Sequence, residues 1–274
     1  HYQNSLIQLP RMNQSLYPEK SDNLSQVKNE IIVKILDSLG VEIPDDLKKQ
    51  AAKEQAIDPH AYELLMKAKY AYINASSAVD LDIAAALFKQ AFDIQPSYIT
   101  ARNFYAIIQF RLKKIDHAIT ILEEAENIGK KNKDDIGLAN IYESFGIIYK
   151  QMGKYSKAIN YLKEGLRITT NNEILSREAN ILNTLGQCYT QMSQFEEASE
   201  YLKRSISIKR QLDRPALEIS NSVANLSDVH KRIGDYAKAI SLREESIEMA
   251  RDSSQVQLGR SITSYANLLY YVGH

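Results

Sequence analysis

The residues that most often perform chemistry in proteins are few and widely spaced in this chain. None of its histidines is placed beside another histidine, a cysteine or a carboxylate at metal-ligand spacing; they are His1, His60, His117, His230 and His274. The ten glycines are scattered, so no glycine-rich phosphate loop is present. Neighbouring carboxylates such as Glu123–Glu124 and Glu244–Glu245 lie on predicted helices, whereas general acid–base catalysis needs carboxylates that converge in a desolvated cleft. We therefore predict no catalytic residue, no metal site and no cofactor.

Composition and charge indicate which classes of binding partner and which cellular compartment to expect. The 274 residues include 34 Lys and Arg and 34 Asp and Glu, so no net field attracts nucleic acid or an anionic membrane. No apolar run approaches the ~20 residues that span a bilayer. The single cysteine, Cys188, favours a reducing compartment, and we expect it to be packed and inert in a cytoplasmic protein. The chain begins at His1, so we expect a fragment or a processed form of a longer protein.

An internal repeat is the main signal in the sequence. Three stretches that begin at Gln151, Gln191 and Arg232 align without gaps, and two earlier stretches fit with less identity. The steps between their shared small residues are 34 to 41 residues long; these residues are Ala84, Ala118, Ala158, Ala198 and Ala239. A period in this range indicates a stack of similar supersecondary units.

Each alanine follows a first helix and a turn that can be read from residue types. In the first helix, Tyr142, Phe145, Gly146 and Tyr149 have the i, i+3, i+4, i+7 spacing of one helix face. The small residue twelve before the alanine predicts close contacts of Gly146 with Ala158 and of Gly186 with Ala198; the same position holds Ala106 and Ser227 in other repeats. Between the two helices, we expect left-handed residues at Gly153, Ser193 and Gly234.

This pattern resembles the tetratricopeptide repeat, and Pro96 matches the proline that ends this repeat in many members. The resemblance implies an all-α fold, a right-handed superhelical solenoid of helix-turn-helix repeats with about five full repeats and a partial sixth. We expect an N-terminal extension with one or two capping helices at 1–57, followed by the array at 58–274. The expected repeats cover approximately 58–97 (with an insert around Asn74–Asp80), 98–134, 138–174, 178–214, 219–254 and, in part, 256–274.

The N-terminal region allows two interpretations. Residues 23–39 have an amphipathic helical pattern, about 45–55 form a second helix, and Asp58-Pro59 is a good helix start. The order resembles the junction in bacterial class III adenylate/guanylate cyclases and related regulators, where a catalytic domain precedes C-terminal repeats. The chain would then be a regulatory region whose catalytic domain lies upstream. Alternatively, the two helices only cap the array.

The resemblance also implies that the first helix of each repeat lines an inner groove. The candidate partner-binding residues are Asn140, Glu143, Ile147, Lys150, Asn180, Asn183, Gln187, Asn221, Asp228 and Lys231. Neighbouring inner positions hold Gln151, Thr190, Gln191, Ala224 and Arg232. Because an asparagine recurs at one inner position and can donate and accept toward an extended backbone, we predict a scaffold that binds a protein or peptide, without catalysis. The alternative is a solvated polar surface. The lysine–asparagine clamp of chaperone-binding members is not matched.

The C-terminal residues 256–272 match the first helix of a further repeat. Ile262, Ala266 and Leu269 have the core spacing. A repeat helix without its second helix leaves an apolar face uncovered, and we expect a homodimer through this end.

Overall fold

The computed structural model describes residues 58–251 and 255–271, so the capping helices predicted within residues 1–57 lie outside the described residues. These residues form helices joined by short turns, with no strand among them, which confirms the all-α prediction. The chain divides into two compact units, residues 1–98 and 99–274, and each is described by itself.

The first unit contains one helix pair, α3 (Pro59–Ile73) and α4 (Ala78–Ile94), whose helices pack against each other. The Asp58 carboxylate accepts hydrogen bonds from the N–H groups of His60 and Ala61 at 2.9 and 3.0 Å, and Pro59 occupies the first helical position, as a helix start favours. The insert predicted around Asn74–Asp80 forms the turn and the start of α4. There Ser77 and Asp80 cap the helix reciprocally, which fixes where α4 begins.

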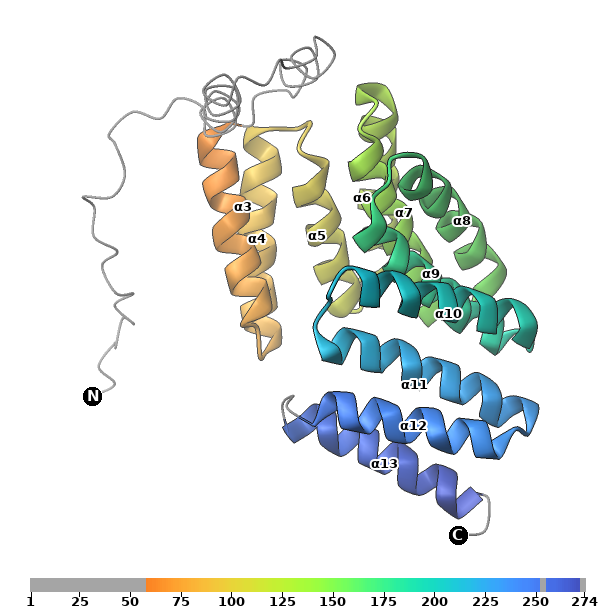
Figure 1. Ribbon diagram of the computed structural model, residues 1–274. Coiled ribbons are helices and arrows are strands. Elements are labelled where there is room, and N and C mark those ends of the chain that lie inside the picture. Colours follow the sequence, from red (N-terminus) through yellow and green to blue (C-terminus); the bar gives the residue numbers. More distant parts are fainter. Residues whose placement is uncertain (1–57, 252–254, 272–274) are drawn as a thin grey trace, which may run out of the picture. The chain divides into compact units, whose positions relative to one another are not determined.

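The second unit is a succession of helix pairs followed by one further helix (Figure 1). Its helices are α5 (Ile99–Arg111), α6 (Ile115–Asn132), α7 (Asp135–Gln151), α8 (Tyr155–Asn171), α9 (Leu175–Gln191), α10 (Phe195–Gln211), α11 (Ala216–Ile233), α12 (Tyr236–Ala250) and α13 (Gln255–Tyr271). Each helix packs against the next one along the chain. This arrangement of consecutive helix pairs is the predicted solenoid.

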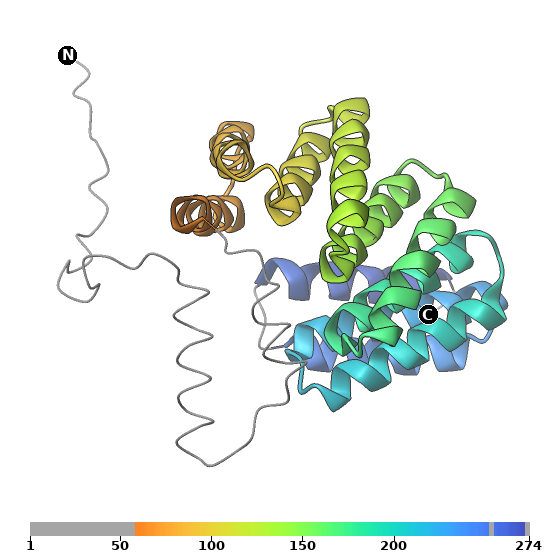
Figure 2. The ribbon, with the colours of Figure 1, turned by 90° about the horizontal axis from the view of Figure 1, so that it is seen from above.

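The first helices of neighbouring pairs also contact one another: α5 with α7, α7 with α9, and α9 with α11. In the described part of the chain, the second helices do not approach one another to the same extent. A stack whose first helices are closer together than its second helices must curve toward the first helices. Helices α7, α9 and α11 therefore form the inner wall of the second unit, within the stack visible in Figure 2.

The predicted apolar face of each first helix lies in the core. Phe145, Leu182 and Leu185 are fully buried, and Tyr149 is nearly so. The small residues lie where the second helix of the pair comes close, and a leucine of that helix is their nearest neighbour. A Cβ at Gly146 would meet the side chain of Leu162 at 2.4 Å, and one at Gly186 would meet Leu202 at 2.5 Å. The nearest atoms belong to the leucine four residues after the alanine, and the carbonyl of Ala198 lies 3.2 Å from the Gly186 position, as the predicted contact with that alanine requires.

The turns within the pairs have the predicted left-handed residues. Gly153 and Gly234 have φ values of 73° and 91°, and Ser193 has a φ of 60°. The same conformation occurs at other non-glycine residues that the sequence did not predict: Lys113, Lys133, Glu173 and Asp213. Lys133, Glu173 and Asp213 lie in the turns that link one helix pair to the next. A left-handed conformation at a non-glycine residue has some conformational cost.

Helix α13 has one face on the array and one face exposed. Leu268 is buried, at the position that Ile148, Cys188 and Val229 occupy in earlier first helices. Two of the residues at the predicted core spacing, Ile262 and Ala266, are exposed. In the earlier pairs a second helix covers this face, so its exposure here follows from the lack of such a helix among the described residues.

Candidate functional site

The candidate inner-groove residues differ in how far they reach solvent. All come from the inner wall of α7, α9 and α11. Seven are half-buried, namely Asn140, Ile147, Lys150, Asn180, Asn183, Gln187 and Lys231, whereas Asn221 and Asp228 are exposed and Glu143 is buried. A partner could thus touch most of these residues but not all of them equally.

A cavity of about 540 Å³ opens on the inner wall. It is lined by Lys150, Tyr155, Gln187, Thr190, Gln191, Asn225, Asp228, Lys231 and Arg232. Two of these residues, Tyr155 and Asn225, were not among the predicted inner positions. Tyr155 is the first residue of α8, and Asn225 lies one residue beyond the inner position Ala224. The cavity brings polar side chains of three successive first helices to one place.

Side-chain hydrogen bonds connect the first helices across the cavity. Lys150 Nζ of α7 donates to Gln187 Oε1 of α9. Arg232 of α11 donates to Gln191 Oε1 of α9 at 3.2 Å. The Asn225 amide donates to Asn183 Oδ1 at 3.0 Å, which forms a third link between α11 and α9. These bonds fix the orientation of the groove's amide groups.

Glu143 belongs to the packing of the groove rather than to its open surface. It is 9 % exposed and accepts a hydrogen bond from Arg177 of α9 at 2.7 Å. Burial raises the pKa of the Glu143 carboxyl, and the Arg177 guanidinium opposes this effect. The carboxylate therefore has a partner inside the scaffold.

Asp228 is likewise held from within the array. Arg243 of α12 is 6 % exposed and donates to the Asp228 carboxylate at 2.6 Å and to the Ala224 carbonyl at 3.2 Å. Sequence reasoning missed both arginines, Arg177 and Arg243, because neither occupies an inner position of a first helix.

The recurring asparagines do not present equivalent surfaces. Asn140 Oδ1 is buried and has no hydrogen-bond partner in the described residues. Asn180 is half-buried, and Asn221 is exposed. The three asparagines, which we call the asparagine ladder, therefore occupy equivalent positions in the sequence, but their exposure to solvent differs along the groove.

Cys188 and Lys150 lie close enough to affect each other's titration. Burial raises the pKa of the Cys188 thiol to about 11, and the thiol is fully buried, which agrees with the prediction of a packed, inert cysteine. Burial also lowers the pKa of the Lys150 ammonium. The lysine is thus in an environment that solvates its charge poorly.

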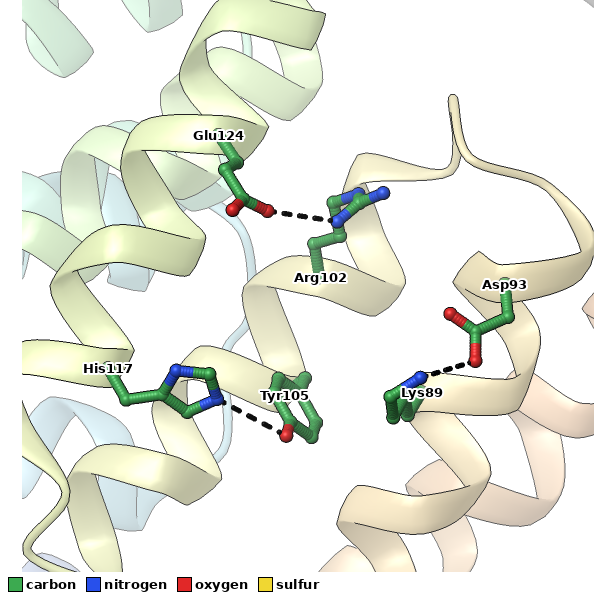
Figure 3. Close-up of polar contacts among 6 residues, drawn as sticks. All are labelled: Lys89, Asp93, Arg102, Tyr105, His117 and Glu124. Carbon is green, nitrogen blue, oxygen red and sulfur yellow. Dashed lines mark hydrogen bonds and ion pairs between the residues drawn. The ribbon is translucent and has the colours of Figure 1, made fainter.

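Several polar contacts lie outside the groove. Between α5 and α6, the Tyr105 hydroxyl lies 3.4 Å from His117 Nε2, and Arg102 forms an ion pair with Glu124 at 3.3 Å (Figure 3). Lys89 and Asp93 form an ion pair within α4. His230 is partly buried, and its Nδ1 lies 3.2 Å from the carboxylate of Asp235. Among the described residues, no group of three His, Cys, Asp or Glu could hold a metal ion. No helix in that part of the chain has the length and apolar character needed to cross a membrane.

Comparisons with known proteins agree with this architecture. A family model described as tetratricopeptide repeat matches residues 97–171 and 177–252, more than half of the chain. The comparison with curated proteins found no match.

Three solved structures illustrate the fold. BtubC from P. vanneervenii is 16% identical with a TM-score of 0.60, and the match covers 79% of this chain and 85% of that one. TTC0263, a tetratricopeptide-repeat protein of Thermus thermophilus, is 20% identical with a TM-score of 0.56 and coverages of 77% and 99%. The hetero-tetramer Cut9–Hcn1 gives 14% identity, a TM-score of 0.59 and coverages of 78% and 41%. At these identities the likeness concerns the fold alone.

Proposed function

Since the chain belongs to the tetratricopeptide-repeat family, we propose that it is a binding scaffold without catalytic activity, which holds an extended segment of a partner protein in the groove of α7, α9 and α11. Proteins of this family bind protein partners. The observation that carries the proposal is the cavity of about 540 Å³, where polar side chains of three successive first helices line one surface.

The chemistry of the groove suits a polypeptide backbone. An extended segment carries N–H and C=O groups that must find partners when they leave water. Asn and Gln offer donors and acceptors in the same side chain, and such residues occur on α7, α9 and α11. In Cut9–Hcn1 a chain of this fold is found in an assembly with a second protein. We expect neither nucleic acid nor a membrane as partner, because the chain carries no net charge, and we expect a cytoplasmic location.

The experiment begins with short peptides selected for binding to the whole chain from a random library, whose affinities are measured by fluorescence anisotropy. Replacing Asn140, Asn180 and Asn221 together by alanine should leave helicity intact and weaken binding at least about tenfold, since each lost hydrogen bond contributes roughly 0.5–1.5 kcal/mol.

A matched triple variant provides the control, with alanine at the exposed residues Asn132, Asn160 and Asn171 of α6 and α8, which should bind as the unmodified chain does. If the groove variant also binds every peptide unchanged, the asparagine ladder is only solvated surface.

Two finer predictions remain to be tested. The cyclase-linked arrangement predicts a catalytic domain encoded upstream of His1, which the surrounding reading frame would show.

The predicted homodimer is supported by the exposed residues Ile262 and Tyr270 of α13, which are 49% and 86% exposed. Light scattering should then report a dimer that Ile262→Glu converts to a monomer; a monomeric unmodified chain would contradict it.

A further inference from the structure

The cavity wall carries more positive than negative charge. Lys150, Lys231 and Arg232 line the cavity together with one carboxylate, Asp228. That carboxylate accepts a hydrogen bond from the buried Arg243 at 2.6 Å, so its charge is already balanced from within the scaffold. The three cations therefore dominate the electrostatics of the opening.

The amide groups add hydrogen-bond donors to this positive surface. Gln187 Oε1 accepts from Lys150, and Gln191 Oε1 accepts from Arg232 at 3.2 Å. Because lysine and arginine side chains have no acceptor, the oxygen of each amide must face the cation, whichever way the amide was first placed. The N–H groups of both glutamines therefore remain as donors, and the described residues give them no partner.

Helix dipoles oppose this positive charge but do not cancel it. Lys150 lies in the last turn of α7, and Lys231 and Arg232 lie in the last turn of α11. The last turn of α9, with Thr190 and Gln191, also lines the cavity. A helix C-terminus acts as roughly −0.5 of an elementary charge, so these three ends offset about half of the three positive charges. The lowered pKa of Lys150 agrees with an ammonium group whose surroundings do not compensate its burial.

We propose that this cavity selects an acidic segment, an extended peptide whose Asp or Glu carboxylates lie against Lys150 and Arg232. The inference rests on the proposed function, that the groove binds a polypeptide, and it adds the charge of the partner. A carboxylate would replace a neutral amide oxygen as the acceptor for each cation, so that an ion pair, bidentate at Arg232, takes the place of an ion–dipole contact. The glutamine N–H groups would then donate to the carbonyl groups of the same segment.

The test uses the peptides selected on the whole chain, each also synthesised with Glu replaced by Gln and Asp by Asn. The selected peptides should be enriched in Asp and Glu. Their amide versions should bind about tenfold more weakly, and binding of the acidic versions should weaken as salt is added.

The Lys150→Gln and Arg232→Gln double variant should lose about the same affinity for the acidic peptides, with its helical circular dichroism unchanged. The matched control is Arg167→Gln with Lys203→Gln, which removes one arginine and one lysine that are exposed on α8 and α10 and lie outside this cavity. The control variant should bind the acidic peptides as the unmodified chain does.

The outcomes separate this inference from the proposed function. If peptides lose affinity in the asparagine triple variant but bind equally in acidic and amide forms, the acidic preference is wrong and the peptide groove stands. If neither set of groove substitutions affects any peptide, or if no peptide is selected, both proposals are wrong. A fluorescent single-stranded oligonucleotide that binds more tightly than the acidic peptides, and loses affinity in the Lys150→Gln and Arg232→Gln variant, would assign the cavity to a nucleic acid and overturn the inference.

Discussion

Replacing Gly146 by alanine should destabilise the α7–α8 pair, although alanine is the better helix former. A Cβ at this position would lie 2.4 Å from both Cγ and Cδ2 of Leu162, far inside van der Waals contact. Leu162 is fully buried, so it has no open space into which it can turn. Overpacking of this kind costs about 1–3 kcal/mol, whereas the helix-propensity gain is about 1 kcal/mol. We expect a net loss of roughly 1–2 kcal/mol, and a larger one for Gly146→Leu.

Two comparisons make this prediction specific. Gly259 of α13 is exposed, and a Cβ there would meet nothing within 4 Å, so Gly259→Ala should be neutral or stabilising by up to about 1 kcal/mol. In a Leu162→Ala background the opposing carbon atoms are gone. Gly146→Ala should there become neutral or stabilising, although Leu162→Ala itself costs about 2–5 kcal/mol.

The assay is urea unfolding followed by circular dichroism, with hydrogen exchange of the α7 and α8 amides, because repeat arrays can unfold in parts. Gly146→Ala should lower the unfolding midpoint and speed exchange in this pair. If it is as stable as the unmodified chain, or if its effect is the same with and without the Leu162→Ala substitution, the close contact between α7 and α8 has been misassigned.

Three further predictions concern the thiol, a turn and catalysis. Folding raises the pKa of the Cys188 thiol from 9.0 to about 11, so between these pH values the folded chain keeps the thiol proton that the unfolded chain has lost. The free energy of unfolding should therefore fall by roughly 3 kcal/mol from pH 9 to pH 11. Cys188→Ala should remove that part of the pH dependence in chemical unfolding. Ser193→Gly should raise the free energy of unfolding by up to about 1 kcal/mol, because Ser193 has a φ of 60°; an unchanged midpoint would contradict the cost assigned to this turn. The purified chain should neither hydrolyse nor cyclise ATP or GTP, and turnover that survives repurification would show a missed site.

The helix pairs could be predicted because their spacing rules are local. Apolar residues at i, i+3, i+4 and i+7 define a buried face before any partner is known, and Tyr142, Phe145 and Tyr149 are all buried. The turn at Gly153 could be predicted for the same reason, since a left-handed residue after a helix favours glycine. The turn at Glu173 could not, because nothing in that residue type signals a positive φ.

The contacts of the groove depend on how far one helix is displaced along another, which the sequence does not reveal. The atoms nearest to a Cβ at Gly146 belong to Leu162, which lies one helical turn beyond the predicted neighbour Ala158 along α8. Glu143 pairs with Arg177, a residue 34 positions away, and is thereby withdrawn from the open surface. The exposure and the pairing of the inner positions therefore could not be predicted from the sequence.

Photo-crosslinking from inside the groove tests the central claim most directly. Benzoylphenylalanine would be introduced at Gln191, an exposed residue of the cavity wall, and separately at Lys203, an exposed residue of α10 outside it. The selected peptides should crosslink to the chain from position 191 and not from position 203. Equal crosslinking from both positions, or crosslinking from position 203 alone, would contradict a binding site on the inner wall of α7, α9 and α11.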